Sequence, residues 1–155
     1  MIDKDFCLSS YVALRYIWKD DVDFAEGMHH ELFKPLPLSE RIPVFTARDI
    51  DNEIKSQFDQ LYAKHSNIGI LLSGGMDSAI LASYLKEGSH AYTFTASGTS
   101  VFDDDVNRAS FYCKKFKLHH HLVEVSFDDF QKFTPIVMKA KCAPVHSIEP
   151  QIYKA

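Results

Sequence analysis

The stretch whose residue types most clearly suggest chemistry is SGGMDS, at residues 73–78. Its paired glycines carry no Cβ, so an anion can approach the backbone closely and positive φ angles are allowed. The hydroxyls of Ser73 and Ser78 can donate hydrogen bonds to phosphate oxygens. The Asp77 carboxylate has the wrong charge to bind phosphate itself, but the right one to hold Mg²⁺ against it. These residues together predict a phosphate-binding turn that carries a metal ligand.

The segments on either side of SGGMDS predict the elements that position it. An apolar run over 68–72 indicates a short buried strand, and residues 79–85 indicate a helix. Strand, glycine turn and helix is the layout that offers backbone N–H groups to a phosphate. No Lys follows the glycines, so this is not the GxxxxGK[ST] loop. A plain glycine turn ahead of an ordinary helix is the alternative, and it leaves the combination of residue types unexplained.

The rest of the chain alternates between helical and strand-like patterns. Thr46 and Asp49 form a variant of the capping box at the start of one helix, and Pro135 is expected to kink or split another. The predicted elements are a near-helical segment at 3–18, helix 47–64, strand 68–72, helix 79–85, strand 91–96, helix 106–116, strand 118–125 and a helix from 127 to about 140. This order predicts an α/β protein with a parallel sheet and helices on both faces. Ligands bind such sheets at the carboxyl ends of strands, where residues 73–77 are expected to lie.

Composition narrows the class of protein. The 155 residues are enough for one domain with a core, and 46% of them are hydrophobic. The net charge of −4 implies no basic face, so nucleic acid is not expected as a partner. No apolar run is long enough to span a membrane, and residues 1–12 lack the order of a signal peptide. Cysteines number three and are widely spaced, which favours a reducing cytoplasm over a disulfide framework.

Residues 73–78 resemble the SGGxDS pyrophosphate loop of the PP-loop (N-type) ATP pyrophosphatases. Residues 69–78, GILLSGGMDS, are similar to the asparagine synthetase branch of that family. Less specific likenesses to asparagine synthetases extend over 9–18, 104–121 and 144–154. The resemblance implies a three-layer, adenine nucleotide alpha hydrolase-like fold. Residues 1–45 would be an N-terminal helix with a Pro-rich connector, and 46–155 the N-terminal half of an ATP-binding synthetase domain.

The resemblance also implies an activity and a set of site residues. Mg-ATP would activate a small, aspartate-like carboxylate as an acyl-adenylate with release of pyrophosphate, and ammonia or another amine would then displace AMP. The residues implied are Ser73, Gly74, Gly75 and Ser78 for the ATP phosphates, Asp77 for Mg²⁺, and Leu71 and Ala96 for the adenine. The chain would then be an AMP-forming carbon–nitrogen ligase of the asparagine synthase type.

Two departures from the family leave the activity open. Residue 2 is Ile, where glutamine-dependent members carry a catalytic Cys, so no glutaminase domain is expected. No second glycine- and acid-rich loop follows Ser78, and no catalytic residue is identified in this half. The chain could be a truncated protein, a split enzyme whose partner chain supplies a second half or a glutaminase, or a decayed paralogue. A catalytically incomplete nucleotide-binding subunit and a β-lactam-forming or sulfur-transferring PP-loop enzyme therefore remain alternatives.

Other groups are weaker candidates for chemistry. In a strand, only the first and third of the histidines at 119–121 share a face, and no Cys or acid lies at a supporting spacing for a metal. The pair at 29–30 is weaker still. Cys142 and His146 are spaced like a nucleophile and its base or half a zinc site, but a buried thiol and a surface His is the preferred interpretation. Glu149 and Gln151 are either substrate contacts or ordinary residues at a helix start.

Overall fold

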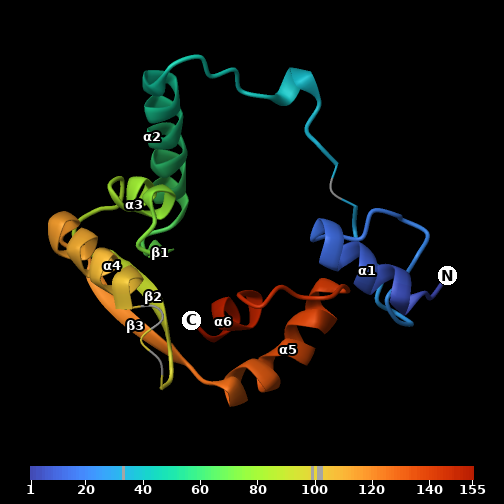
Figure 1. Ribbon diagram of the computed structural model, residues 1–155. Helices are drawn as coiled ribbons and strands as arrows, with labels where there is room; N and C mark the ends of the chain where they lie inside the picture. The colour runs from blue at the N-terminus through green and yellow to red at the C-terminus, as the bar shows by residue number, and fades with distance from the viewer. Residues whose placement is uncertain (33, 99, 101–102) are drawn as a thin grey trace. The chain divides into compact units, whose positions relative to one another are not determined.

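The computed structural model describes residues 1–32, 34–98, 100 and 103–155 (Figure 1). These residues form two compact units. One unit comprises residues 42–125, and the other comprises residues 1–41 together with 126–155. The expected boundary between an N-terminal segment, 1–45, and a synthetase domain, 46–155, stays a prediction.

The unit of residues 42–125 is an α/β unit with an all-parallel sheet, as the alternating pattern predicts (Figure 1). Its three strands lie in the order β1-β2-β3, and in the register Gly69 pairs with His90 and His90 with His119. Its elements are α2 (Ala47–Lys64), β1 (Gly69–Leu71), α3 (Met76–Ala82), β2 (His90–Ala96), α4 (Asp103–Phe116) and β3 (His119–Val125). The predicted capping box of Thr46 and Asp49 is present at the start of α2.

The core of this unit lies between one face of the sheet and the helices. Two same-direction crossovers place α3 and α4 on the face to which Ala91 points. The buried cluster consists of Leu72, Ala82, Leu85, Ala91, Ala109, Cys113 and Leu118. Phe58 and Tyr62 of α2 pack against it. The other face carries His90, Tyr92 and His121, and the helical layer expected over it stays a prediction.

Three local differences from the predicted elements have physical reasons. Helix α3 begins at Met76, directly after the glycines, and α4 begins at Asp103. Each helix therefore takes its acidic residues into its first turn, where the helix dipole favours negative charge. Helix α1 (Lys4–Leu14) is shorter than the predicted segment because Arg15 turns into the left-handed region at φ 65°.

The unit of residues 1–41 and 126–155 contains α1, a short 3-10 turn (Leu38–Glu40), α5 (Phe127–Lys141) and α6 (Glu149–Lys154). Asp3 caps α1 through the Phe6 N–H (2.9 Å). Two ion pairs join α5 to α6: Lys154 Nζ lies 2.6 Å from Asp129 Oδ2, and Lys141 Nζ lies 2.7 Å from Glu149 Oε1. No helix among the described residues is both long and apolar enough to cross a membrane.

Pro135 does not divide α5, so a split of this helix, one of the two expected effects, is wrong, and a kink at Pro135 stays a prediction. The helix runs from Phe127 to Lys141 with Pro135 inside it. Its N-terminus is fixed by a capping box in which Ser126 and Asp129 bond to each other's backbone N–H groups. Capping and packing against α6 together offset the hydrogen bond that Pro135 does not make.

Candidate functional site

The SGGMDS turn begins where β1 is tied firmly to β2. Leu72, the residue after β1, is 1% exposed. Its N–H donates to the Tyr92 carbonyl (2.8 Å), and its carbonyl accepts from the Thr93 hydroxyl (2.8 Å). The turn therefore starts from a fixed point at the carboxyl end of β1, as the sequence predicts.

Hydrogen bonds between its own serines close the turn. The hydroxyl oxygens of Ser73 and Ser78 lie 3.0 Å apart, and the Ser73 N–H donates to Ser78 Oγ (3.2 Å). Ser78 Oγ also lies 3.2 Å from the Gly75 carbonyl, to which it can donate, and the Gly75 N–H donates to Ser73 Oγ (3.3 Å). These bonds connect the end of β1 to the first turn of α3, and they bring the hydroxyls of Ser73 and Ser78 together inside the turn.

The structure requires glycine at position 74 but not at position 75. Gly74 is buried and has φ 74°, which L side chains rarely adopt. A Cβ at Gly74 would lie 2.4 Å from the carbonyl oxygen of Asp105 in the first turn of α4. Gly75 has φ −78°, and a Cβ there would meet only Ser73 Oγ, at 3.3 Å. Close approach of α4 therefore requires glycine at position 74, whereas position 75 is not constrained in this way.

Asp77 and the start of α3 offer a free carboxylate beside free backbone donors. Asp77 is exposed, and its carboxylate makes no hydrogen bond or ion pair within the described part of the chain. Helix α3 has no side-chain cap, so N–H groups of its first turn have no partner in the helix. Donors for a phosphate and an oxygen ligand for Mg²⁺ thus occur in one turn, and these residue types fit both groups.

The structure does not place Leu71 and Ala96, the two expected adenine contacts, side by side. Leu71 ends β1 and pairs with Tyr92, while Ala96 lies four residues further along β2 and pairs with Val125. At about 3.3 Å per residue, that offset is roughly 13 Å along the strand. Leu71 is 40% exposed and Ala96 is half-buried. A role for both in one adenine site stays a prediction.

The histidines of β3 divide between the two sheet faces, as alternation predicts. His121 Nε2 lies 2.7 Å from Nδ1 of His90 on β2, and the two rings stack at 5.0 Å between centroids. His120, on the opposite face, contacts the Thr93 hydroxyl at 2.9 Å. Burial, and the nearby charge of His121, lower the pKa of His120. Among the residues that the structure describes, no group of three His, Cys, Asp or Glu side chains could hold a metal ion.

The candidates near the C-terminus make structural contacts. Cys142 Sγ contacts the Lys139 carbonyl (3.5 Å), and His146 Nδ1 accepts from the Ile148 N–H (3.4 Å). No contact between that thiol and that imidazole occurs in the described structure. Glu149 accepts from Lys141 and from the His146 N–H (2.6 Å), and Gln151 donates to a backbone carbonyl (3.2 Å).

Sequence reasoning missed two features that arise from the packing of the chain. The contact of Asp105 with Gly74 depends on how α4 packs, and a run of three acids gives no signal for it. His30 is 4% exposed, and neither ring nitrogen has a hydrogen-bond partner in the described structure. Its buried position becomes visible only once the chain is folded.

Comparison of this sequence with known protein families identifies the family to which the chain belongs. The family model described as asparagine synthase matches residues 53–153, which include the whole SGGMDS turn, the sheet and α3 to α5. Searches of curated proteins and of solved structures give no match. The matched region covers well over half of the chain and contains the turn on which the resemblance was based. The chain therefore belongs to the asparagine synthase family.

Proposed function

We propose that this chain is the ATP-binding part of an amide-forming ligase of the asparagine synthase type. The observation that carries the proposal is the SGGMDS turn, in which Ser73 and Ser78 meet beside unpaired N–H groups and the free carboxylate of Asp77. The turn lies within the region matched by a family of ATP-dependent amide ligases. A PP-loop fold with a second helical layer over the open sheet face belongs to the same proposal.

Each residue of the turn has a proposed part. Ser73, Gly74, Gly75 and Ser78 are proposed to hold the phosphate oxygens of ATP. Their hydroxyl and N–H groups would donate to the phosphate in place of the hydrogen bonds that they make within the turn. Asp77 would hold Mg²⁺, which when bound neutralises the charge that grows on the leaving pyrophosphate. These fixed donors act by electrostatic stabilisation and need no proton transfer of their own.

The proposed reaction has two balanced steps. A carboxylate oxygen of a small, aspartate-like acid attacks the α-phosphorus of ATP, forming an acyl–phosphate bond while pyrophosphate leaves. The nitrogen of ammonia or another amine then attacks the acyl carbon, the bond from that carbon to the AMP oxygen breaks, and the nitrogen releases a proton to solvent, which gives the amide and AMP. Leu71 and Ala96 are proposed to line the adenine.

A second candidate is nucleotide binding without turnover by this chain itself. Its supporting observation is that, within these 155 residues, Gly98 is the last glycine, and no second glycine- and acid-rich loop lies between the turn and residue 155. The carboxylate site and a further Mg²⁺ ligand would then come from residues outside these 155, in the same chain or in another.

Pyrophosphate release from Mg-ATP, measured by a coupled phosphate assay with aspartate and ammonia, distinguishes the two candidates. We expect little release from this chain, with the residual signal removed by Asp77→Ala and kept by Asp128→Ala. Asp128 is a matched control because it is exposed and, like Asp77, is the second residue of its helix. Robust, Asp77-dependent release would make the second candidate wrong. Release that both variants keep in full would contradict the proposed role of the turn.

A further inference from the structure

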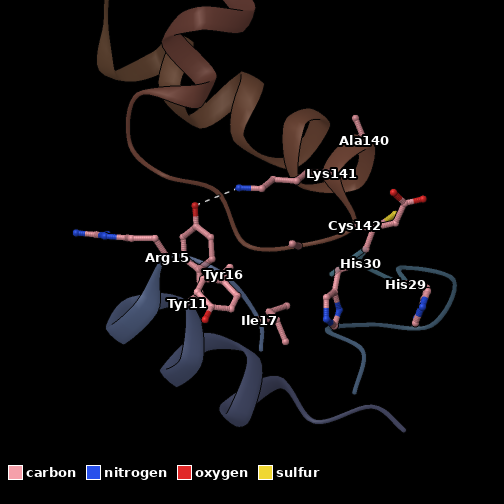
Figure 2. Close-up of a pocket in the computed structure, with 11 residues that line it drawn as sticks. Tyr11, Arg15, Tyr16, Ile17, His29, His30, Ala140, Lys141 and Cys142 are labelled. Atoms are coloured by element: carbon pink, nitrogen blue, oxygen red, sulfur yellow. Dashed lines mark hydrogen bonds between the residues drawn. The ribbon is translucent and has the colours of Figure 1, made fainter. Parts of the chain in front are cut away.

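Three polar side chains are buried among the residues that the structure describes: Ser10, His30 and Thr93. Ser10 bonds to two backbone groups of its own unit, and His30 lines a pocket of about 430 Å³ in that unit, with no hydrogen-bond partner in the described structure (Figure 2). Thr93 differs from both, because it lies beside the SGGMDS turn and has two partners, one of them a side chain. A buried hydroxyl with two partners is held in one orientation, so Thr93 is suited to fix the groups that it contacts.

The hydrogen bonds of Thr93 run in one direction, from β3 to the turn. The Leu72 carbonyl oxygen can only accept, so the single proton of the Thr93 hydroxyl points to it (2.8 Å). In the other contact of this hydroxyl, with His120 Nε2 at 2.9 Å, the imidazole must then be the donor. Burial, and the nearby charge of His121, lower the pKa of His120, so the ring is neutral at about pH 7 and carries its one proton on Nε2.

This chain of bonds ends on the peptide group between Leu72 and Ser73. The carbonyl of that group accepts from Thr93, and its N–H, which belongs to Ser73, donates to Ser78 Oγ (3.2 Å). One peptide group is therefore held from the sheet on its oxygen and from α3 on its nitrogen. Because a peptide group is planar, fixing the carbonyl oxygen also fixes the direction of the N–H bond.

Binding of a phosphate as proposed would use only one of these two supports. If Ser78 turns its hydroxyl to the phosphate, the Ser73 N–H loses its partner within the turn and becomes free to donate to the anion. The bond from Thr93 stays, because Thr93 lies on the other side of the peptide group and is 2% exposed. A donor that is already held in direction costs less conformational entropy when the anion binds.

We propose that Thr93 and His120 are positioning residues for the nucleotide site. His120 donates to the Thr93 hydroxyl, and this hydroxyl holds the Leu72 carbonyl. The Ser73 N–H on the same peptide group is thereby directed to the phosphate of bound ATP. Neither Thr93 nor His120 needs to contact the nucleotide. This role rests on the proposed binding of ATP by the turn, and it adds a support for the turn that begins on β3, the strand furthest from it in the sheet order.

Calorimetric titration of the full chain with Mg-ATP tests this role with two pairs of variants. Thr93→Val keeps the shape of the side chain but removes the hydroxyl, and we expect it to weaken binding by about 5-fold or more. Thr93→Ser keeps the hydroxyl and should bind within about 2-fold of the wild type. His120→Leu should weaken binding by about 2- to 5-fold, whereas His120→Gln, whose amide can donate in place of Nε2, should restore it.

Thr134→Val is the matched control, because the half-buried Thr134 also donates its hydroxyl to a backbone carbonyl, that of Phe130 (2.6 Å), in the other unit. Its free energy of unfolding should fall while its Mg-ATP affinity equals that of the wild type. Urea unfolding of each variant separates loss of binding from loss of folding. If Thr93→Val does not fold, the two His120 variants decide.

The position of the proton on His120 is a second test, and it needs no nucleotide. Nitrogen NMR of protein labelled at its histidines, at about pH 8, should show this proton on Nε2, with the His120 signals assigned by their loss in His120→Gln. A proton on Nδ1 would overturn the role of Thr93 and His120 and leave the proposed function intact. Wild-type affinity in Thr93→Val, while Asp77→Ala binds weakly, would do the same. No binding of Mg-ATP to the wild type would overturn both.

Discussion

Gly74 lies in the proposed phosphate-binding turn, and two structural features require glycine there. Its φ of 74° is one reason for glycine, and the carbonyl oxygen of Asp105 is a second, because a Cβ would lie 2.4 Å from it. Gly98 has nearly the same backbone angle, φ 73°, with no atom within 4 Å of a Cβ. The two glycines therefore separate the cost of the angle from the cost of the contact.

We expect Gly74→Ala to lower the free energy of unfolding by about 2–4 kcal/mol, because it adds a steric clash to the left-handed angle. Gly98→Ala should cost only about 1 kcal/mol, since the angle alone is unfavourable there. Urea unfolding followed by circular dichroism measures both. Equal losses for the two variants would show that α4 does not press against the turn.

At the residue scale, the sequence predicts chemistry better than it predicts contacts. The types of Ser73, Asp77 and Ser78 indicate phosphate and metal binding without any knowledge of packing. The contact of Asp105 with Gly74 depends on where α4 lies in three dimensions, and the burial of His30 depends on the residues that pack around it. Neither has a signal in local sequence pattern, because both arise from residues far away along the chain.

Helix α5 tests how far a local rule applies at the scale of an element. Pro135 lacks the N–H that would bond the Gln131 carbonyl, yet the helix continues through it. We expect Pro135→Ala to raise the free energy of unfolding by about 1–3 kcal/mol, because Ala restores this bond and removes the ring clash. Urea denaturation measures the change, with Lys132→Ala on the same helix as control. An unchanged or lowered free energy of unfolding would contradict this expectation.

The contact of α5 with α6 predicts a dependence of stability on pH. The ion pair with Lys154, and then the hydrogen bonds from Ser126, lower the pKa of Asp129 well below its usual value. Because the pKa is lowered in the folded state, the stabilisation is complete above the unfolded value of about 3.9 and is lost as pH falls through the folded value. The free energy of unfolding of the wild type should therefore fall more steeply between about pH 5 and pH 2 than that of Asp129→Asn.

Asp128→Asn is the control for this pH dependence, because Asp128 is the exposed neighbour in the same helical turn. Its stability should fall with pH as steeply as that of the wild type. Acid titration of unfolding in urea measures all three proteins. Identical slopes for Asp129→Asn and the wild type would show that the ion pair does not hold α6 to α5 in solution.

The helices and strands whose ends are marked by capping residues or by clusters of β-forming residues were the most predictable. Helix α2 has the predicted bounds because Thr46 caps it and its apolar residues fall on one face. The strands β2 and β3 lie within one residue of their predicted starts, since β-forming residues cluster there. The start of α3 was less predictable, because a helix that begins on a glycine has no capping side chain to mark it.

At the scale of the whole molecule, the family follows from the sequence more firmly than the activity does. Alternating strands and helices predict the parallel sheet, and the turn after β1 predicts the family that the match to residues 53–153 shows. Catalysis requires groups at the carboxylate and amine, and no residue type in the chain marks them. The central claim is accordingly that the turn binds Mg-ATP.

Calorimetric titration of the full chain with Mg-ATP tests that claim most directly, with the wild type, Asp77→Ala and Asp128→Ala compared under the same conditions. We predict weak but saturable binding to the wild type and to Asp128→Ala. Asp77→Ala should bind at least about 10-fold more weakly, because a charged metal ligand contributes more than 1 kcal/mol. Identical binding heats for Asp77→Ala and the wild type, or no binding to the wild type, would contradict the claim.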